Sequence, residues 1–270
     1  MIANYQLNGN PVVEVPIVGN LAYDELGREV LARHNEGFRG VPHIEDNTKY
    51  KEGQPLSYSN VPRVLSYNQI LREISPNVQI LSPEEVVQFW DSIPERDSTY
   101  ADTNSIAVYP TEGPNEDLRK IVLNLLNLNP TIPLKVSGLG VDKADNNLGF
   151  TFTRGELTQV AEAHYLEKDG RVSYENGELV ASEQGIPVWT AQSGLRGVYR
   201  GRSDRLDARF DYLLLSIESG RVQVLQDPQG RTENLESKLL ELNAQKEQQI
   251  AEIEARYRQA SGFLRTGRFQ

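Results

Sequence analysis

Cysteine is absent from this chain of 270 residues, and histidine occurs only three times. Without cysteine the protein forms no disulfide, has no thiolate nucleophile and offers no sulfur ligand to zinc. The three histidines, His34, His43 and His164, do not fall into a metal-binding spacing such as HExxH. The sequence therefore predicts no resident metal and no cofactor, and it is compatible with any redox compartment.

Long apolar runs are also missing. The chain has no stretch of about eighteen consecutive apolar residues, so we expect no membrane-spanning segment. Its first residues lack a basic region followed by a continuous apolar core, so we expect no signal peptide. These absences predict a protein that is made in the cytoplasm and stays in aqueous solution.

The charge balance is acidic, with a net charge of −10 and an isoelectric point near 5.0. Such a body repels nucleic acid and anionic membranes at long range, so only a local basic patch could bind them. We therefore expect neither nucleic acid nor membrane as a partner.

Patterning along the chain predicts an α+β fold that mixes helices with short antiparallel strands. Four regions are expected: an extended N-terminal arm (1–62), a helix-rich α+β region (63–130), an α+β region with hairpins (131–230), and a long C-terminal helix with coiled-coil character and a basic tail (231–270). Prolines interrupt the arm, and only residues 21–34 have helical spacing within it.

The region 63–130 contains three helix signals and one strand signal. Ser82 and Glu85 have the spacing of a capping box, with Pro83 at the first helical position. Ser66 and Asn115 are expected to cap two further helices, and residues 105–110 read as a short strand.

The region 131–230 contains hairpin signals. Residues 133–141 and 148–153 are expected to pair, and Asn176-Gly177 favours a tight turn between two strands. Helices are expected over 157–168 and over 204–217, where apolar residues recur at three- and four-residue steps, and a strand is expected over 221–226.

One arginine-rich stretch, residues 197–220, could suggest a nucleic-acid groove. Arg205 and Arg209 alternate there with aspartates, which would cancel contacts to phosphates, so a solvated helix face is the better interpretation. Arg196, Arg200 and Arg202 have no such neighbouring acids. We expect these three to bind a small anion or an acidic loop of a partner.

The last forty residues are rich in Glu, Gln, Lys, Leu and Ala, and their apolar positions largely follow heptad steps. A long helix packed on its own body is the alternative to coiled-coil pairing. The basic tail adds Arg265 and Arg268 as contacts to an acidic surface. The expected interface residues are Leu235, Leu239, Leu242, Ile250, Ile253, Tyr257, Phe263, Leu264 and Phe269.

No catalytic motif is present: the chain has neither a P-loop nor a GxSxG elbow. Asp and Asn residues at 142–149 could supply oxygen ligands to calcium, although turn chemistry also explains them. A pair of carboxylates could serve a hydrolase, as in glycoside hydrolysis. The candidate carboxylates are Glu84, Glu85, Asp91, Glu95 and Asp97.

Taken together, these features predict a structural or assembly protein without catalytic residues. It is expected to form a homo-oligomer and to contact other proteins of a larger particle. By analogy alone, a virion component of a phage head, neck or tail has this anatomy. The alternative is a carboxylate-dependent hydrolase that oligomerises through its C-terminal helix.

Overall fold

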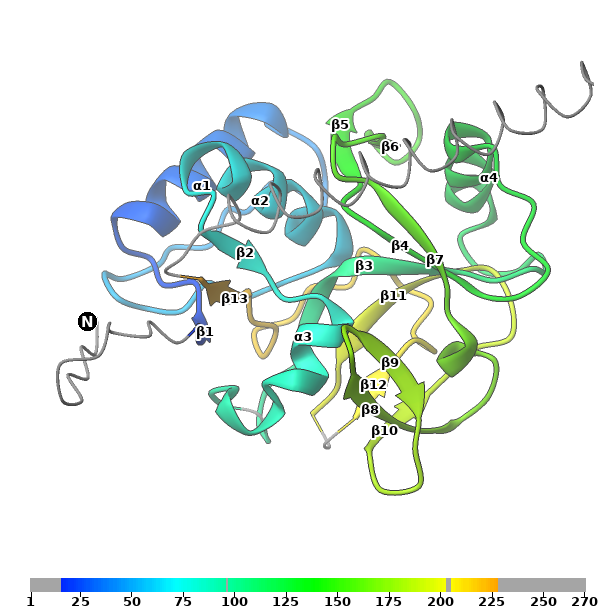
Figure 1. Cartoon of the computed structure of the whole chain (residues 1–270). Helices are drawn as coiled ribbons and strands as arrows, with labels where there is room; N and C mark the ends of the chain where they lie inside the picture. Colours follow the sequence, from blue (N-terminus) through cyan, green and yellow to red (C-terminus); the bar gives the residue numbers. More distant parts are fainter. Residues whose placement is uncertain (1–15, 96, 203–204, 228–270) are drawn as a thin grey trace, which may run out of the picture. The chain divides into compact units, whose positions relative to one another are not determined.

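An eight-stranded sheet dominates the computed structural model, which describes residues 16–95, 97–202 and 205–227 (Figure 1). Every neighbouring pair in the sheet is antiparallel except β10 and β12. From edge to edge the strands are β7 (Gln159–Glu162), β4 (Leu134–Ser137), β3 (Ala101–Val108), β11 (Leu195–Arg200), β12 (Leu206–Asp207), β10 (Ile186–Trp189), β8 (Gly170–Glu175) and β9 (Glu178–Ala181).

Two smaller sheets accompany the large one. In the first, β13 (Gln223–Gln226) lies between β1 (Ile17–Asn20) and β2 (Val78–Ile80), antiparallel to both. The second is the hairpin of β5 (Gly140–Lys143) and β6 (Phe150–Thr153). Segments from both ends of the described chain thus meet in one sheet.

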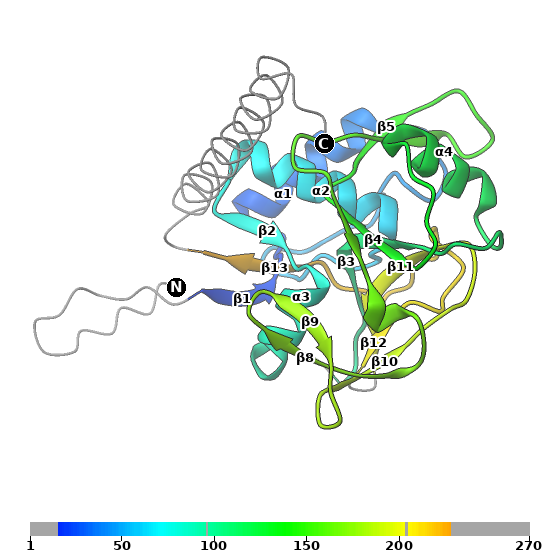
Figure 2. The same ribbon diagram turned by 45° about the vertical axis from the view of Figure 1, so that its right-hand side comes forward.

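Four α-helices and two short 3₁₀ helices are described. The α-helices are α1 (Glu25–Gly37), α2 (Val61–Ile74), α3 (Pro83–Gln88) and α4 (Glu116–Leu126), and the 3₁₀ helices are η1 (Trp90–Ser92) and η2 (His164–Leu166). Helices α1 and α2 lie side by side in both ribbon views, and α2 also packs on β2 and β3 (Figures 1 and 2). None of the helices in the described ranges is long and apolar enough to cross a membrane.

Three apolar clusters form the core. One contains Ile106 and Phe150, between the central sheet and the β5–β6 hairpin. A second gathers Trp90, Val198 and Leu206 on α3, η1 and the strands near them. The third joins α1, α2 and the three-stranded sheet. The protein therefore buries apolar side chains on several surfaces of its sheets.

Several local predictions are confirmed. Ser82 and Glu85 form the expected capping box at the start of α3. Asn176 and Gly177 form the turn between β8 and β9 with positive φ angles of 51° and 93°. A tight hairpin turn requires positive φ at both positions, and Asn-Gly is the residue pair that adopts such angles most readily. The hairpin β5–β6 and the strand β13 are also present, as is a helix, α1, that overlaps the expected 21–34 region and continues to Gly37.

The predicted fold class is wrong, because the described chain is mostly β rather than an α+β mixture. Residues 157–168, expected as a helix, form β7 and η2, and β7 pairs with β4. Residues 204–217, also expected as a helix, contain the short strand β12 followed by turns. In both segments pairing with distant strands outweighs a weak helical spacing.

The expected extended arm is also incorrect over its described part. Residues 16–62 include β1, α1 and buried apolar residues such as Leu21, Ile44 and Leu56, which are at most 3% exposed. Pro16, Pro42 and Pro55 lie outside the named helices and strands, and Pro62 stands in the first turn of α2, so these prolines do not prevent burial. The expected C-terminal helix lies outside the described residues.

Two predicted caps are different as well. Helix α2 begins at Val61 with Asn60 as its cap, whereas Ser66 lies inside the helix and its hydroxyl bonds the ring of His34. Asn115 precedes α4 but makes no side-chain cap. Its amide instead donates to the carbonyls of Leu195 and Asp211, both at 2.8 Å.

Candidate functional site

A run of exposed apolar side chains follows β12 and is the main surface feature of the described chain. We name it the apolar strip: Phe210, Tyr212, Leu215 and Ile217, whose exposed fractions are 39%, 69%, 42% and 38%. In the described ranges only two other large apolar side chains are similarly exposed, one on β1 and one on β7. Exposed apolar residues that gather in this way mark interaction surfaces more often than isolated ones do.

The backbone of the strip is held in place by the body of the protein. Leu213, within the strip segment, is only 4% exposed and its carbonyl accepts from the amide of Val61 at 3.2 Å. The amide of Ile217 donates to the hydroxyl of Tyr100 at 3.3 Å, and Asn115 bonds the carbonyl of Asp211. The strip is therefore presented on a fixed framework although its side chains face solvent.

A row of aromatic rings connects the strip to the central sheet. Tyr100 and Tyr199 are 6.3 Å apart between ring centroids, Tyr199 and Phe210 are 6.2 Å apart, and Phe210 and Tyr212 are 5.7 Å apart. Burial raises the pKa of Tyr100 to about 12 and that of Tyr199 still further. Both hydroxyls stay neutral in ordinary buffers and act as hydrogen-bonding groups.

Beside the strip, two arginines lie over one indole. The guanidinium carbons of Arg205 and Arg209 are 3.5 and 3.7 Å from the ring centroid of Trp189. Both arginines also pair with the buried carboxylate of Asp207, at 3.2 and 3.3 Å. The expected neutralisation of these arginines by aspartate therefore occurs, although on a strand and a turn rather than on a helix.

Two of the three arginines expected to contact an anion are structural instead. Arg200 is fully buried, and it donates to the side chains of Gln223 at 3.1 Å and Thr99 at 2.8 Å. Arg196 donates to the carbonyls of Ser193 and Arg209 and lies 3.8 Å from the carboxylate of Asp211. Apart from Ser193, the partners named here are 13 or more residues away in sequence, so a count of neighbouring charges does not reveal them.

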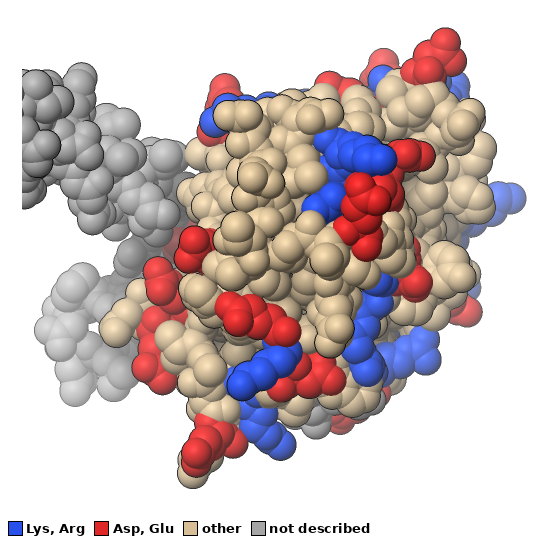
Figure 3. Space-filling view, turned by 90° about the vertical axis from the view of Figure 1, so that its right-hand side faces the viewer, with Lys and Arg blue, Asp and Glu red and all other residues tan. Residues whose placement is uncertain are grey.

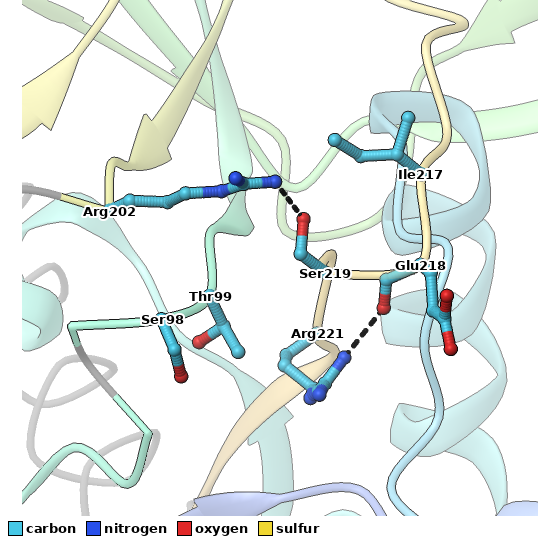
Figure 4. Close-up of a pocket in the computed structure, with 7 residues that line it drawn as sticks. All are labelled: Ser98, Thr99, Arg202, Ile217, Glu218, Ser219 and Arg221. Atoms are coloured by element: carbon cyan, nitrogen blue, oxygen red, sulfur yellow. Dashed lines mark hydrogen bonds between the residues drawn. The ribbon is translucent and has the colours of Figure 1, made fainter.

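The third arginine, Arg202, is exposed and lines a pocket (Figure 4). This open space of about 480 Å³ is lined by Arg202, Arg221, residues 98–99 and residues 217–219. Arg202 reaches across it to donate to the hydroxyl of Ser219. The pocket adjoins the apolar strip, because Ile217 belongs to both.

The other candidate residues are dispersed in the structure. Glu84 pairs with Lys135, Glu85 belongs to the capping box, and Glu95 pairs with Arg221 at 2.9 Å. In the structure these three carboxylates therefore form ion pairs or cap a helix. Asp91 and Asp97 lie on η1 and in the loop before β3.

The 142–149 loop is the β5–β6 connection. Asn146 there bonds the amide of Leu148 and the carbonyl of Phe150, as a turn residue does. His164, expected on a helix face, is exposed on η2 beside Glu162 and Glu167. Across the described ranges no group of three His, Cys, Asp or Glu residues is arranged to hold a metal ion.

The expected interface residues of the C-terminal region, together with Arg265 and Arg268, lie outside the described residues. Sequence reasoning missed Ser98, Thr99, Ser219 and Arg221 of the pocket, which carry no motif. Of the strip residues, the helical spacing predicts only Phe210 and Ile217 on an apolar helix face, and three consecutive leucines, 213–215, are too many for a narrow helical stripe.

Charged side chains of both signs are interspersed on the face shown in Figure 3, around a broad uncharged area. This face has no extended basic field of the kind that follows a nucleic-acid backbone. Comparisons with protein-family models, with curated proteins and with solved structures find no match to this chain.

Proposed function

We propose that this protein is a structural subunit that associates with copies of itself, and with other proteins, in a larger assembly. The observation that carries the proposal is the apolar strip, whose side chains are exposed on a backbone that the body holds in place. By analogy with the subunits of such particles, we propose that the assembly is a phage virion.

The chemistry of the strip suits a protein contact. Tyr212 is the most exposed of the strip residues, and tyrosine at the centre of an interface combines a large apolar area with a hydrogen-bonding hydroxyl. Phe210, Leu215 and Ile217 add apolar surface on the same short segment. Covering these side chains removes apolar surface from water, which favours association.

The charges beside the strip favour a second copy as the occupant. Arg209 and Asp211 are 43% and 47% exposed at their side chains and have opposite signs. In a two-fold contact each subunit presents the same surface to the other, so Arg209 of one copy can approach Asp211 of the next. A surface that carries both signs in this way is complementary to itself.

The test is the molar mass of the full chain by light scattering over a range of concentrations. We expect the mass of the wild-type protein to exceed that of one chain, and the double variant Tyr212→Ser/Leu215→Ser to show a lower average mass at each concentration. Val160→Ser is the matched control, because Val160 is 40% exposed on β7 and outside the strip. Equal masses for all three proteins would reject the strip as a self-association surface.

A further inference from the structure

The pocket beside the strip contains hydrogen-bond donors that have no partner among the described residues. An arginine side chain has five N–H donors. Within the described ranges, Arg202 donates only to the hydroxyl of Ser219, and no described carboxylate lies within 4.0 Å of its guanidinium nitrogens. Because Ser219 accepts from Arg202, its own hydroxyl proton is available to a ligand.

Arg221 adds a second guanidinium whose orientation is fixed. Its Nε donates to Glu95 at 2.9 Å, and one terminal nitrogen donates to the carbonyls of Glu218 and Gly220 at 2.8 and 3.1 Å. The structure assigns no partner among the described residues to the other terminal nitrogen. A guanidinium held in this way loses little conformational freedom when it binds an oxyanion.

Of the two cations that line the pocket, only Arg221 is paired with a carboxylate among the described residues. Glu95 pairs with Arg221 and balances its charge. Glu218 also lines the pocket, but Figure 4 shows its carboxylate turned away from Arg202. Among the described residues no carboxylate pairs with Arg202, whose guanidinium contacts the hydroxyl of Ser219. Arginine combined with serine hydroxyls is a donor set that suits oxyanions.

We infer that this pocket binds a small oxyanion of the phosphate or carboxylate type, with Arg202 as the main charged contact and Ser219 as a hydroxyl donor. The terminal nitrogen of Arg221 that has no partner among the described residues supplies a further donor. Oxyanion binding here requires no association between subunits. It can therefore fail or succeed separately from the self-association of the apolar strip.

The test is isothermal titration of the full chain with inorganic phosphate and, in a separate arm, with acetate, both at constant ionic strength. We expect saturable binding of at least one of them, and the arm that responds identifies the type of oxyanion. Arg202→Gln removes the charge but keeps a polar side chain on an exposed position, so the fold should persist. We expect it to weaken binding about tenfold or more.

Arg154→Gln is the matched control, since Arg154 is an exposed arginine outside the pocket. It should leave the affinity unchanged within about twofold. The inference is overturned if neither anion binds saturably at millimolar concentrations. It is equally overturned if Arg202→Gln binds as well as the wild type, or if Arg154→Gln loses as much affinity as Arg202→Gln.

Discussion

The ring of Phe210 stands nearly perpendicular to the ring of Tyr199, with an interplanar angle of 77° and 6.2 Å between centroids. Tyr199 belongs to β11 in the central sheet, whereas Phe210 begins the apolar strip. Edge-to-face packing of this kind adds stability beyond area burial. This contact fixes the start of the strip to the sheet.

Arg200 provides a test of the buried polar contacts behind this surface. We expect Arg200→Met to lower the free energy of unfolding by about 3 kcal/mol, because Thr99 and Gln223 lose a charged partner in a buried site. Urea denaturation measures the change. Arg202→Gln, at an exposed position, should stay within about 0.5 kcal/mol of the wild type. A similar small effect for Arg200→Met would mean that Arg200 is not a structural residue.

His34 makes the protein sensitive to acid. Burial lowers the pKa of His34 from 6.5 to about 4. Its Nε2–H donates to the carbonyl of Ile44 and its Nδ1 accepts from Ser66, so the neutral ring satisfies both neighbours. The unfolded chain takes up this proton at higher pH than the native one. The contribution of the neutral His34 ring to the free energy of unfolding is therefore fully present above about pH 6.5. It decreases by about 3 kcal/mol as the pH falls toward 4.

The measurement compares urea unfolding at pH 7.5 and at pH 4.5. His34→Gln cannot be protonated, so it should lose less stability on acidification than the wild type does. The exposed His164→Gln is the control and should retain the acid sensitivity of the wild type. If His34→Gln loses as much as the wild type, burial of the neutral His34 ring is not a source of the acid sensitivity.

Asp102 has the opposite effect on how the stability depends on pH. Burial raises the pKa of Asp102 from 3.8 to about 6, in spite of the hydroxyl of Ser59 that donates to it at 2.9 Å. The native state holds this proton more tightly than the unfolded chain. The stabilising contribution is therefore complete below about pH 4 and is lost as the pH rises through 6, by at most about 3 kcal/mol.

Asp102→Asn removes the ionisation and keeps an oxygen that can accept from Ser59. We expect it to be more stable than the wild type at pH 7.5, with the difference vanishing near pH 4, as followed by thermal unfolding. Asp145→Asn, on the exposed β5–β6 loop, should change little at either pH. A destabilised Asp102→Asn at pH 7.5 would show that the charged form is the one the native state prefers.

Two of the correct sequence predictions concern residues whose partners lie within a few positions. Ser82 and Glu85 cap α3 across three residues, and Asn176-Gly177 sets its own turn. Such short-range preferences act in nearly any fold. These two elements can therefore be predicted without knowledge of the rest of the fold.

The wrong predictions concern residues whose structure depends on partners distant in the sequence. Leu206, Phe210, Leu213 and Ile217 have helical spacing, yet Leu206 and Leu213 are buried whereas Phe210 and Ile217 are exposed. A helix with these residues on one face would bury all four, so the spacing alone could not reveal the strand β12. The sequence likewise does not reveal the buried contacts of Arg200, because Thr99 and Gln223 are distant in sequence.

The most direct test of self-association through the strip uses the absence of cysteine from the chain. Leu215→Cys creates a single thiol in the strip, and Val160→Cys creates one on β7 with similar exposure. Disulfides between two copies form only where their Cα atoms come within about 7 Å. Under mild oxidation of dilute protein, the account predicts a covalent dimer of Leu215→Cys on non-reducing gels and none of Val160→Cys. Equal cross-linking of the two variants, or none in either, would contradict it.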